Sequence, residues 1–369
     1  MLFSLIYDNR QSSYRKQYWL LCSVLVLFMG LRYNVGGDSL SYAINFEDSP
    51  LLNQITEFDL FGTRYPPLWV ILVSFCKTVF HSFISLQLIQ AAFVNIVLFF
   101  FFEKNVARKF TAVAFYVFLY YLIFNTETMR AACSIAFFVI GYPYYTRNKW
   151  VLFYFFSILS IGFHYEAIIL LLLPFAKLFN KLSFNIKNLA VISLIAILLT
   201  LSGDLVPVIS EFFKTNAILF ESIDYYSSYV GKNNFNGYVA FYLLQVPYLS
   251  FVYFNRNRLP KEILLMAILF IILSLLSLSF GIIMSRTRDL FAPFIIVLIA
   301  NTIAVIKKNK NVIVKFIAIS AIIVVLVVKA NYYIKDDRWK LWYPYSSIFA
   351  PENSLEREDI YDNFLRGYR

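Results

Sequence analysis

Long apolar runs recur along almost the entire chain, and they constrain its fold more than any other feature. Segments such as LAVISLIAILLTLS (189–202) and KFIAISAIIVVLVV (315–328) contain at most one charge. With their flanking residues they approach the roughly 20 residues that carry a helix across about 30 Å of hydrocarbon. Of the 369 residues, 60% are hydrophobic and only 15% are charged, and one soluble core could not bury that much apolar surface. The chain is therefore predicted to be an all-α polytopic membrane protein.

About eleven segments have the composition of transmembrane helices. They are 18–31, 84–102, 111–125, 131–146, 150–163, 165–180, 189–202, 238–254, 263–283, 290–306 and 312–330. A further apolar segment, 67–80, is shorter and begins at a Pro-Pro pair. It is predicted to be a re-entrant or interfacial helix, which is tolerated where protein or a water-filled cavity lines it. A full crossing is the alternative.

Clusters of Lys and Arg predict the orientation in the membrane. More than half of the 33 basic residues lie in clusters near 10–16, 104–109, 147–149, 177–187, 256–261 and 307–315, accompanied only by Asp8, Glu103 and Glu262. Because such clusters collect on the cytoplasmic side, the N-terminus is predicted to be cytoplasmic. The net charge of +11 then reflects membrane topology, and nucleic acid is not an expected partner because no soluble basic domain exists to hold it.

This threading predicts a membrane domain over 1–330, with outer loops at 32–66 and 203–237, and an outward-facing C-terminal tail at 331–369. No soluble catalytic domain is visible, so any chemistry must sit in or just above the membrane. Two histidines and three cysteines, the latter all in apolar segments, show no metal-ligand spacing. Neither a metal nor another cofactor is predicted, and membrane lipids are the expected surroundings.

Several polar side chains from separate segments map to the outward side. They are Arg32, Asp38, Tyr42, Arg130, His164, Glu166, Arg286, Arg288 and Tyr345. Taken singly, each has a simpler explanation: an arginine at a helix end reaches for lipid headgroups, a histidine at a hinge is often structural, and a tyrosine fits an aromatic belt. Their coincidence on one face is harder to explain in that way, because the outward face should be poor in arginine.

The residue types point to lipid-diphosphate chemistry. A guanidinium binds phosphate oxygens in pairs and keeps its charge, while a nearby carboxylate or imidazole can take a proton from a hydroxyl nucleophile. Gly36 and Gly37 permit a tight turn that aims Asp38 rather than merely exposing it. The set therefore predicts group transfer from a lipid diphosphate.

Five motifs in this order resemble the EpsG family of Wzy-type polysaccharide polymerases. They are RYNVGGDSLSY (32–42), ETMRAACSIAFFVIGYPYYTRNK (127–149), GFHYEAIILLLLPF (162–175), SRTRDLFAPF (285–294) and YPYSSIF (343–349). The resemblance implies a metal-independent, GT-C-like glycosyltransferase of the bacterial inner membrane. Such an enzyme joins undecaprenyl-diphosphate-linked repeat units into capsule, exopolysaccharide or O-antigen on the outer side. A chain-length regulator is a candidate partner.

The resemblance also assigns roles by position. Asp38 is the first candidate for the general base and His164 the second. Arg130, Arg286 and Arg288 are candidates for holding the diphosphate, with the sequence not separating the last two. The remaining matches are Arg32 and Tyr42 on the acceptor side, Tyr345 in the tail, and Glu166, which stands where the family has a small hydroxyl residue.

Two other functions fit the same residues. A ligase that moves finished glycan onto another acceptor would need the same groups. A flippase or transporter of the lipid-linked glycan would predict internal repeats and broken helices at mid-membrane, and no repeat is visible. Deletion of the gene separates the last case, because single repeat units at the surface indicate a missing polymerase and no units indicate a missing flippase.

We expect Arg32, Arg130, His164 and Arg286 to share the outward side, with 67–80 not crossing. Cysteines introduced at positions 103–110 should therefore resist a membrane-impermeant thiol reagent added to whole cells. Labelling of these positions from outside would make 67–80 a true span and reverse the assignment of that cluster.

Overall fold

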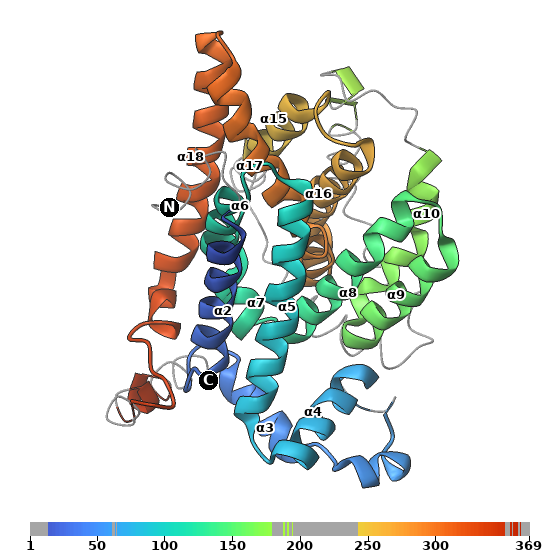
Figure 1. Ribbon diagram of the computed structural model, residues 1–369, viewed down its shortest axis with the longest axis vertical. Helices are drawn as coiled ribbons and strands as arrows, with labels where there is room; N and C mark the ends of the chain where they lie inside the picture. Colours follow the sequence, from blue (N-terminus) through green and yellow to red (C-terminus); the bar gives the residue numbers. More distant parts are fainter. Residues whose placement is uncertain are drawn as a thin grey trace.

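The computed structural model describes residues 14–60, 63, 65–178 and 243–350, with single positions at 187–188, 190–191, 194, 355, 357–360 and 362. The described residues form helices and one isolated β-bridge (Figure 1). The predicted outer loop 203–237 lies outside the described residues, and the predicted span 189–202 is described at only three positions. The all-helical fold class is confirmed for the part of the chain that is described.

The helices coincide with the predicted spans to within a few residues, except that 238–254 is described as a helix from Val246. In chain order they are α2 (Arg15–Gly30), α3 (Ser39–Asp48), η1 (Leu52–Glu57), α4 (Pro67–Phe80), α5 (Phe83–Asn105), α6 (Lys109–Tyr116), η2 (Val117–Tyr121), α7 (Leu122–Thr126), α8 (Met129–Thr146), α9 (Trp150–Phe163), η3 (Tyr165–Leu172), α10 (Leu173–Ala176), α15 (Val246–Asn255), α16 (Lys261–Asp289), α17 (Ala292–Lys308), α18 (Val312–Ile334) and η5 (Lys335–Leu341).

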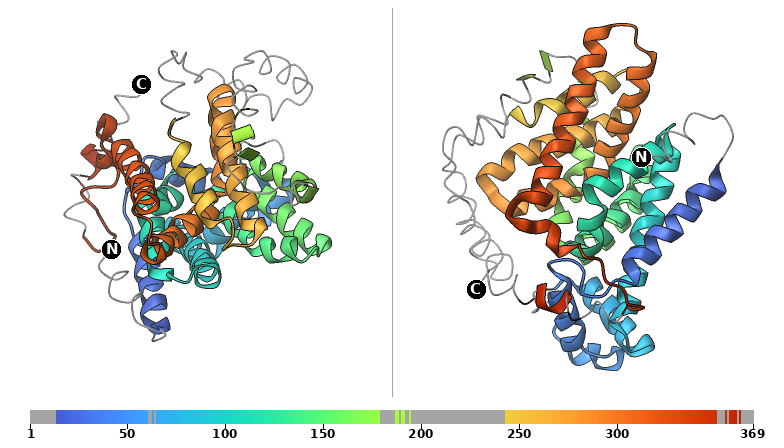
Figure 2. Two further views of the ribbon diagram at one scale, coloured as in Figure 1. Left: turned by 90° about the horizontal axis from the view of Figure 1, so that it is seen from above. Right: turned by 90° about the vertical axis from the view of Figure 1, so that its left-hand side faces the viewer.

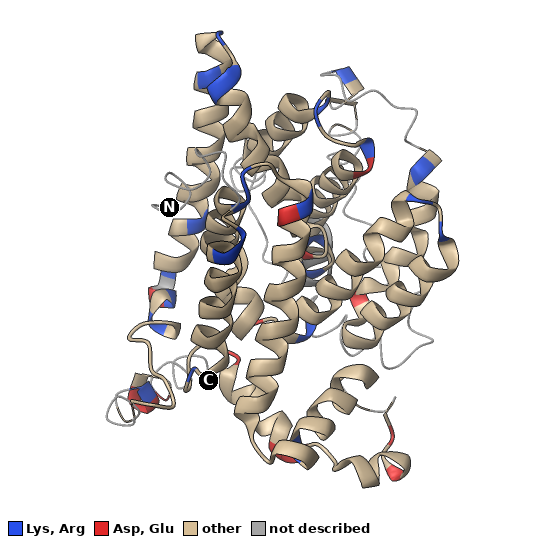
Figure 3. Ribbon diagram, in the orientation of Figure 1, with Lys and Arg blue, Asp and Glu red and all other residues tan. Residues whose placement is uncertain are grey.

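Length and composition identify membrane-crossing helices among the described residues. Phe83–Asn105, Lys109–Thr126 and Val312–Ile334 are long and apolar enough to span a bilayer, and Pro67–Phe80, Trp150–Phe163 and Tyr165–Ala176 are shorter apolar helices. Large apolar side chains also cover the outside: Val151 on α9 is 84% exposed and Phe316 on α18 is 70% exposed. Figure 3 shows long stretches of helix without charge. Water would disfavour such a surface and lipid would not, so the chain is a membrane protein.

Several buried amide side chains inside the bundle hydrogen-bond to neighbouring helices. Residues Val117–Tyr121 form a π-helical turn between α6 and α7, which shifts the backbone hydrogen bonds of that helix. The Asn125 side-chain amide donates to the Tyr121 carbonyl at 2.7 Å, and the Gln90 amide donates to the Phe124 carbonyl at 3.1 Å. Asn95 then joins Asn125 (3.0 Å) on the next helix. These bonds supply partners that lipid could not.

Helix α4 keeps both of its ends at one end of the bundle. Tyr65, just before α4, lies under Arg130 at the start of α8, and Lys77 in its last turn donates to the Ser49 carbonyl after α3 at 2.8 Å. The next helix, α5, begins three residues after α4 ends. A helix that does not cross the membrane requires this arrangement. We call this end, where α2, α7, α16 and α18 finish and α8 begins, the site end.

The chain also returns to the site end after α18. Arg32 and Ser347 form the isolated antiparallel bridge, in which the Tyr33 amide donates to the Ser346 carbonyl at 3.0 Å. Figure 2 shows the segment after α18 (red) beside the segment that follows α2 (blue). Arg357 is fully buried and donates to the Asn34 carbonyl at 2.6 Å. The described part of the tail therefore packs on the membrane domain.

Candidate functional site

A glycine turn positions the first candidate residues. Gly36 has a φ of +104°, and a Cβ there would lie 2.3 Å from the Thr126 Cβ, so both the backbone angle and the close approach require glycine. The Gly36 amide donates to the Leu341 carbonyl at 2.7 Å, and the Trp342 indole donates to the Thr126 hydroxyl at 3.0 Å. The turn is thus held between α7 and the tail, and it delivers an exposed Asp38 at the start of α3.

Glu127, in the short connection between α7 and α8, is hydrogen-bonded to this turn. Its carboxylate accepts the Gly37 amide at 2.6 Å, the Asp38 amide at 3.2 Å and the Thr126 hydroxyl at 3.2 Å. Burial, together with the charge of Asp38, raises the pKa of Glu127 to about 7 against the opposing effect of these hydrogen bonds. A carboxyl that titrates near neutral pH beside a second carboxylate is an arrangement common at functional sites.

Arg130 lies next to this pair, in the first turn of α8. The charge of its guanidinium acts on the Tyr42 hydroxyl, which donates to the Glu127 carbonyl at 3.3 Å. The guanidinium also lies over the ring of Tyr65, 4.9 Å from the centroid. The Arg130 Nε is buried and has no hydrogen-bond partner among the described residues. A buried N–H without a partner is rare in folded proteins, and it marks this guanidinium as available to an anion.

Three further residues complete the group. His164 ends α9 in an extended conformation, and its Nδ1 contacts the Glu166 carboxylate. The charge of Arg130 interacts electrostatically with Glu166 and Tyr65. The charge of Arg286 interacts with Glu166 and Tyr42. We call the group the arginine cluster; its members are Tyr42, Tyr65, Arg130, His164, Glu166 and Arg286.

The structure separates the other predicted residues from this cluster. Arg288 donates from Nε (3.0 Å) and Nη2 (2.7 Å) to the Asp289 carboxylate and lies over the Phe270 ring. The late arginines, which the sequence could not separate, thus have different surroundings. Only Arg286 lies with the arginine cluster.

Arg32 and Tyr345 belong to the junction between α2 and the tail. Arg32 is 1% exposed and donates to the Met29 carbonyl at 2.6 Å. Burial lowers its pKa to about 10, and the charge of Glu127 opposes that shift. Tyr345 stacks on Phe28 with 4.3 Å between the centroids. Both residues support the turn that carries Asp38, and neither is in contact with Arg130 in the described contacts.

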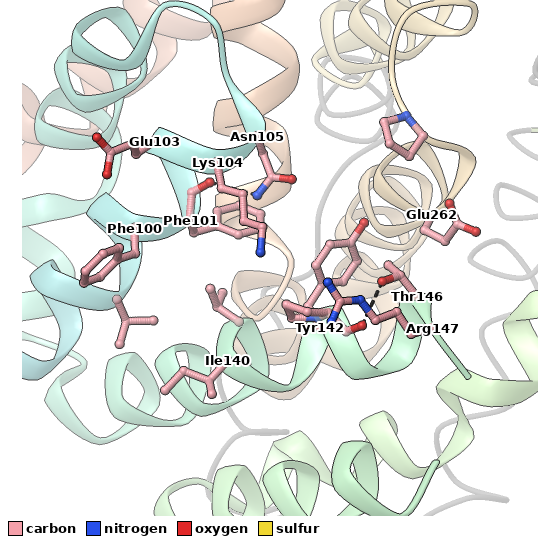
Figure 4. A pocket seen from close by; sticks show the side chains of 14 residues that line it. Phe100, Phe101, Glu103, Lys104, Asn105, Ile140, Tyr142, Thr146, Arg147 and Glu262 are labelled. Carbon is pink, nitrogen blue, oxygen red and sulfur yellow. Dashed lines mark hydrogen bonds between the residues drawn. The ribbon is translucent and has the colours of Figure 1, made fainter. Parts of the chain in front are cut away.

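A cavity of about 620 Å³ lies at the opposite end of the bundle, between the ends of α5 and α8 and the start of α16. Lys104, Tyr142 and Arg147 extend into it (Figure 4). It contains none of the predicted site residues, so we do not assign the chemistry to it. Within the described part of the chain, no three His, Cys, Asp or Glu side chains are close enough to hold a metal ion.

Sequence reasoning missed Glu127 and Tyr65. Glu127 stands in the segment NTETM directly before the helix that Arg130 opens. An acid at the edge of a membrane helix is costly enough to be a signal. Nothing in the sequence, however, indicates that its partners are amides 90 residues earlier. Tyr65 carries no signal of its own in a chain with 27 tyrosines.

Comparison with known proteins gives one match. The sequence model described as the EpsG family matches residues 16–347, most of the chain. This confirms the resemblance inferred from the five motifs. No curated protein and no solved structure matches.

Glu127 should impose a pH dependence on activity. Above pH 7 its carboxylate is ionised and accepts both amides of the turn, and below pH 7 the protonated form holds them less well. Activity should therefore fall about tenfold per pH unit below about pH 7 if the ionised form is required. Glu127→Gln keeps an acceptor oxygen but cannot titrate, so its activity should be lower and nearly constant between pH 6 and 8. An unchanged acidic limb in Glu127→Gln would assign the titration to another group.

Proposed function

The chain belongs to the EpsG family, whose members are Wzy-like polysaccharide polymerases, and we propose that it joins undecaprenyl-diphosphate-linked oligosaccharide repeat units. The site would face outward from the bacterial inner membrane, on a GT-C-like fold that works without a metal. The product would be a surface polysaccharide such as capsule, exopolysaccharide or O-antigen.

The observation that carries this proposal is the arginine cluster. Two guanidinium groups from different helices, Arg130 on α8 and Arg286 on α16, act on the same tyrosine, Tyr42. Holding two cations together in a region poor in water is unfavourable unless anions accompany them. Glu166 supplies one negative charge, and the Arg130 Nε still has no partner. A diphosphate supplies the remaining charge and the acceptor oxygens.

The reaction is a substitution at an anomeric carbon. A hydroxyl oxygen of the acceptor sugar forms a bond to the anomeric carbon of the donor, and the bond from that carbon to the diphosphate oxygen breaks. The electron pair leaves with undecaprenyl diphosphate, whose growing negative charge Arg130 and Arg286 stabilise. The hydroxyl proton passes to the Asp38 carboxylate, which is exposed at the edge of the cluster.

His164 has a different part in this scheme. Its contact with Glu166 keeps that carboxylate partly occupied, so Glu166 neutralises the arginine cluster only in part and the cluster still attracts the diphosphate. Glu127 positions Asp38 through the turn and does not need to touch the substrate. Arg32 and Tyr345 lie outside the arginine cluster and fix the end of α2 against the tail.

Arg130→Lys should abolish polymer formation while the protein still inserts in the membrane. Lysine keeps the charge but lacks the fork that binds two phosphate oxygens, and loss of such a stabilising donor costs about 100-fold in rate. The assay uses purified protein and a defined lipid-linked repeat unit, with product lengths measured on a gel. Arg147→Lys, at the opposite end of the bundle, is the control and should give normal polymer. Normal polymer from Arg130→Lys would make Arg130 a headgroup anchor.

Asp38→Asn and His164→Ala should fail in different ways. The Asp38→Asn side chain is almost isosteric, so donor binding should persist while turnover falls by about 10²–10⁴-fold, as for loss of a general base. His164→Ala should weaken donor binding, because the released Glu166 then competes with the diphosphate for the arginines. Asp48→Asn, at the other end of α3, is the control. Normal turnover in Asp38→Asn, together with donor binding but no reaction in His164→Ala, would reverse the two roles.

A further inference from the structure

The last turn of α16 presents its two arginines to opposite sides. Arg286 and Arg288 are two residues apart, which is about 200° around a helix. Arg286 acts on Tyr42 and Glu166 in the arginine cluster. Arg288 instead lies over Phe270, 5.4 Å from the ring centroid, and interacts with residues on α15 and the π-helical turn. The end of α16 therefore stands between two cationic regions.

The second region is built from tyrosines and cations of five elements. Lys329 on α18 lies 4.7 Å from the ring centroid of Tyr332, 5.1 Å from that of Tyr333 and 5.5 Å from that of Tyr120. Arg338 in η5 lies 4.7 Å from the Tyr332 centroid. We call this group the tyrosine–lysine cluster; its members are Tyr120, Tyr248, Arg288, Lys329, Tyr332, Tyr333 and Arg338.

Two cations of this cluster, Arg288 and Lys329, differ in their carboxylate partners. Asp289 forms an ion pair with the Arg288 guanidinium. Among the described residues, no carboxylate lies within ion-pairing distance of Lys329. A lysine that merely reached for lipid headgroups would extend its ammonium into water. Lys329 is instead only partly exposed and is surrounded by ring faces, which attract a cation without neutralising it. The tyrosine hydroxyls around it can donate to an anion.

Two neighbouring carboxylates, Asp38 and Glu127, interact electrostatically with one cluster each. Asp38 acts on Tyr42 in the arginine cluster and on Glu127. Glu127 acts on Tyr332 and Tyr333 in the tyrosine–lysine cluster. Asp38, the proposed base beside Glu127, can take the proton of an acceptor hydroxyl that approaches from the tyrosine–lysine cluster. That hydroxyl then attacks the donor held at the arginine cluster.

We propose that the tyrosine–lysine cluster binds the diphosphate of a second lipid-linked glycan, the acceptor, while the arginine cluster holds the donor. The inference rests on the proposed function, because a polymerase must hold two lipid diphosphates at once. The leaving diphosphate needs the two arginines of the arginine cluster, Arg130 and Arg286. The acceptor diphosphate does not react, so a weaker site with Arg288 already paired to Asp289 is sufficient to anchor it.

Native mass spectrometry of the full-length protein in detergent, with undecaprenyl diphosphate as the probe, tests the proposal. The unaltered protein should bind two molecules. Lys329→Ala combined with Arg338→Ala should bind one, since loss of charge-assisted hydrogen bonds weakens the second site by about tenfold or more. Arg130→Ala should also bind one, and the combination of all three should bind none. Retention of one molecule in Lys329→Ala/Arg338→Ala and in Arg130→Ala shows that these variants are folded.

Two controls separate this site from ordinary lipid contact. Lys335→Ala removes an exposed lysine from the same end of α18 and should leave two molecules bound. Phosphatidylglycerol, a phosphate lipid with one phosphate, should not displace the second undecaprenyl diphosphate at equal concentration. Displacement by phosphatidylglycerol, or two bound molecules in Lys329→Ala/Arg338→Ala, would overturn the proposal even if the unaltered protein polymerises normally. Failure of the proposed function gives a different result, namely no bound undecaprenyl diphosphate and no polymer.

Discussion

The free energy of holding charge away from water governs this architecture. In a bundle covered by lipid-facing side chains, each ionisable group must find a counter-charge, a hydrogen bond or a route to the aqueous boundary. The protein meets that condition by placing most cations at helix ends and by pairing polar amides around the π-helical turn. At the site end the condition is met only in part. Arg130 keeps a buried N–H without a described partner, and Lys329 is held by ring faces. Such incompletely balanced cations are the basis of the diphosphate binding that we propose for this end of the bundle.

The site end contains two cationic regions, which differ in how far carboxylates neutralise their guanidinium groups. Glu166 moderates the field of Arg130 and Arg286 without cancelling it, and Asp289 nearly cancels that of Arg288. Glu127 holds the turn through the backbone amides of Gly37 and Asp38, and its charge also acts on Tyr332 and Tyr333. The same side chain therefore fixes the geometry of the turn and contributes to the electrostatic field of the tyrosine–lysine cluster. Its replacement would change both properties together.

Sequence patterns predicted the helices because a lipid-facing helix needs a continuous apolar run, which is a local property. They also singled out the arginines, because the predicted outward face should be poor in arginine. They could not separate Arg286 from Arg288, because the direction of each depends on the rotation of α16 about its axis, which packing against distant helices decides. Glu127 was missed because backbone amides of the turn are its partners, and amides carry no sequence signature. The return of the tail to Arg32 was missed for the same reason.

The closure of the tail has a consequence for biogenesis. The turn that carries Asp38 is synthesised long before the tail, yet its amide at Gly36 bonds to Leu341 and its neighbour Thr126 bonds to Trp342. Both partners in the tail follow α18 in the chain. The nascent protein can therefore insert most of its helices before the site is assembled. A chain that stops before α18 ends leaves its early turn without these supports.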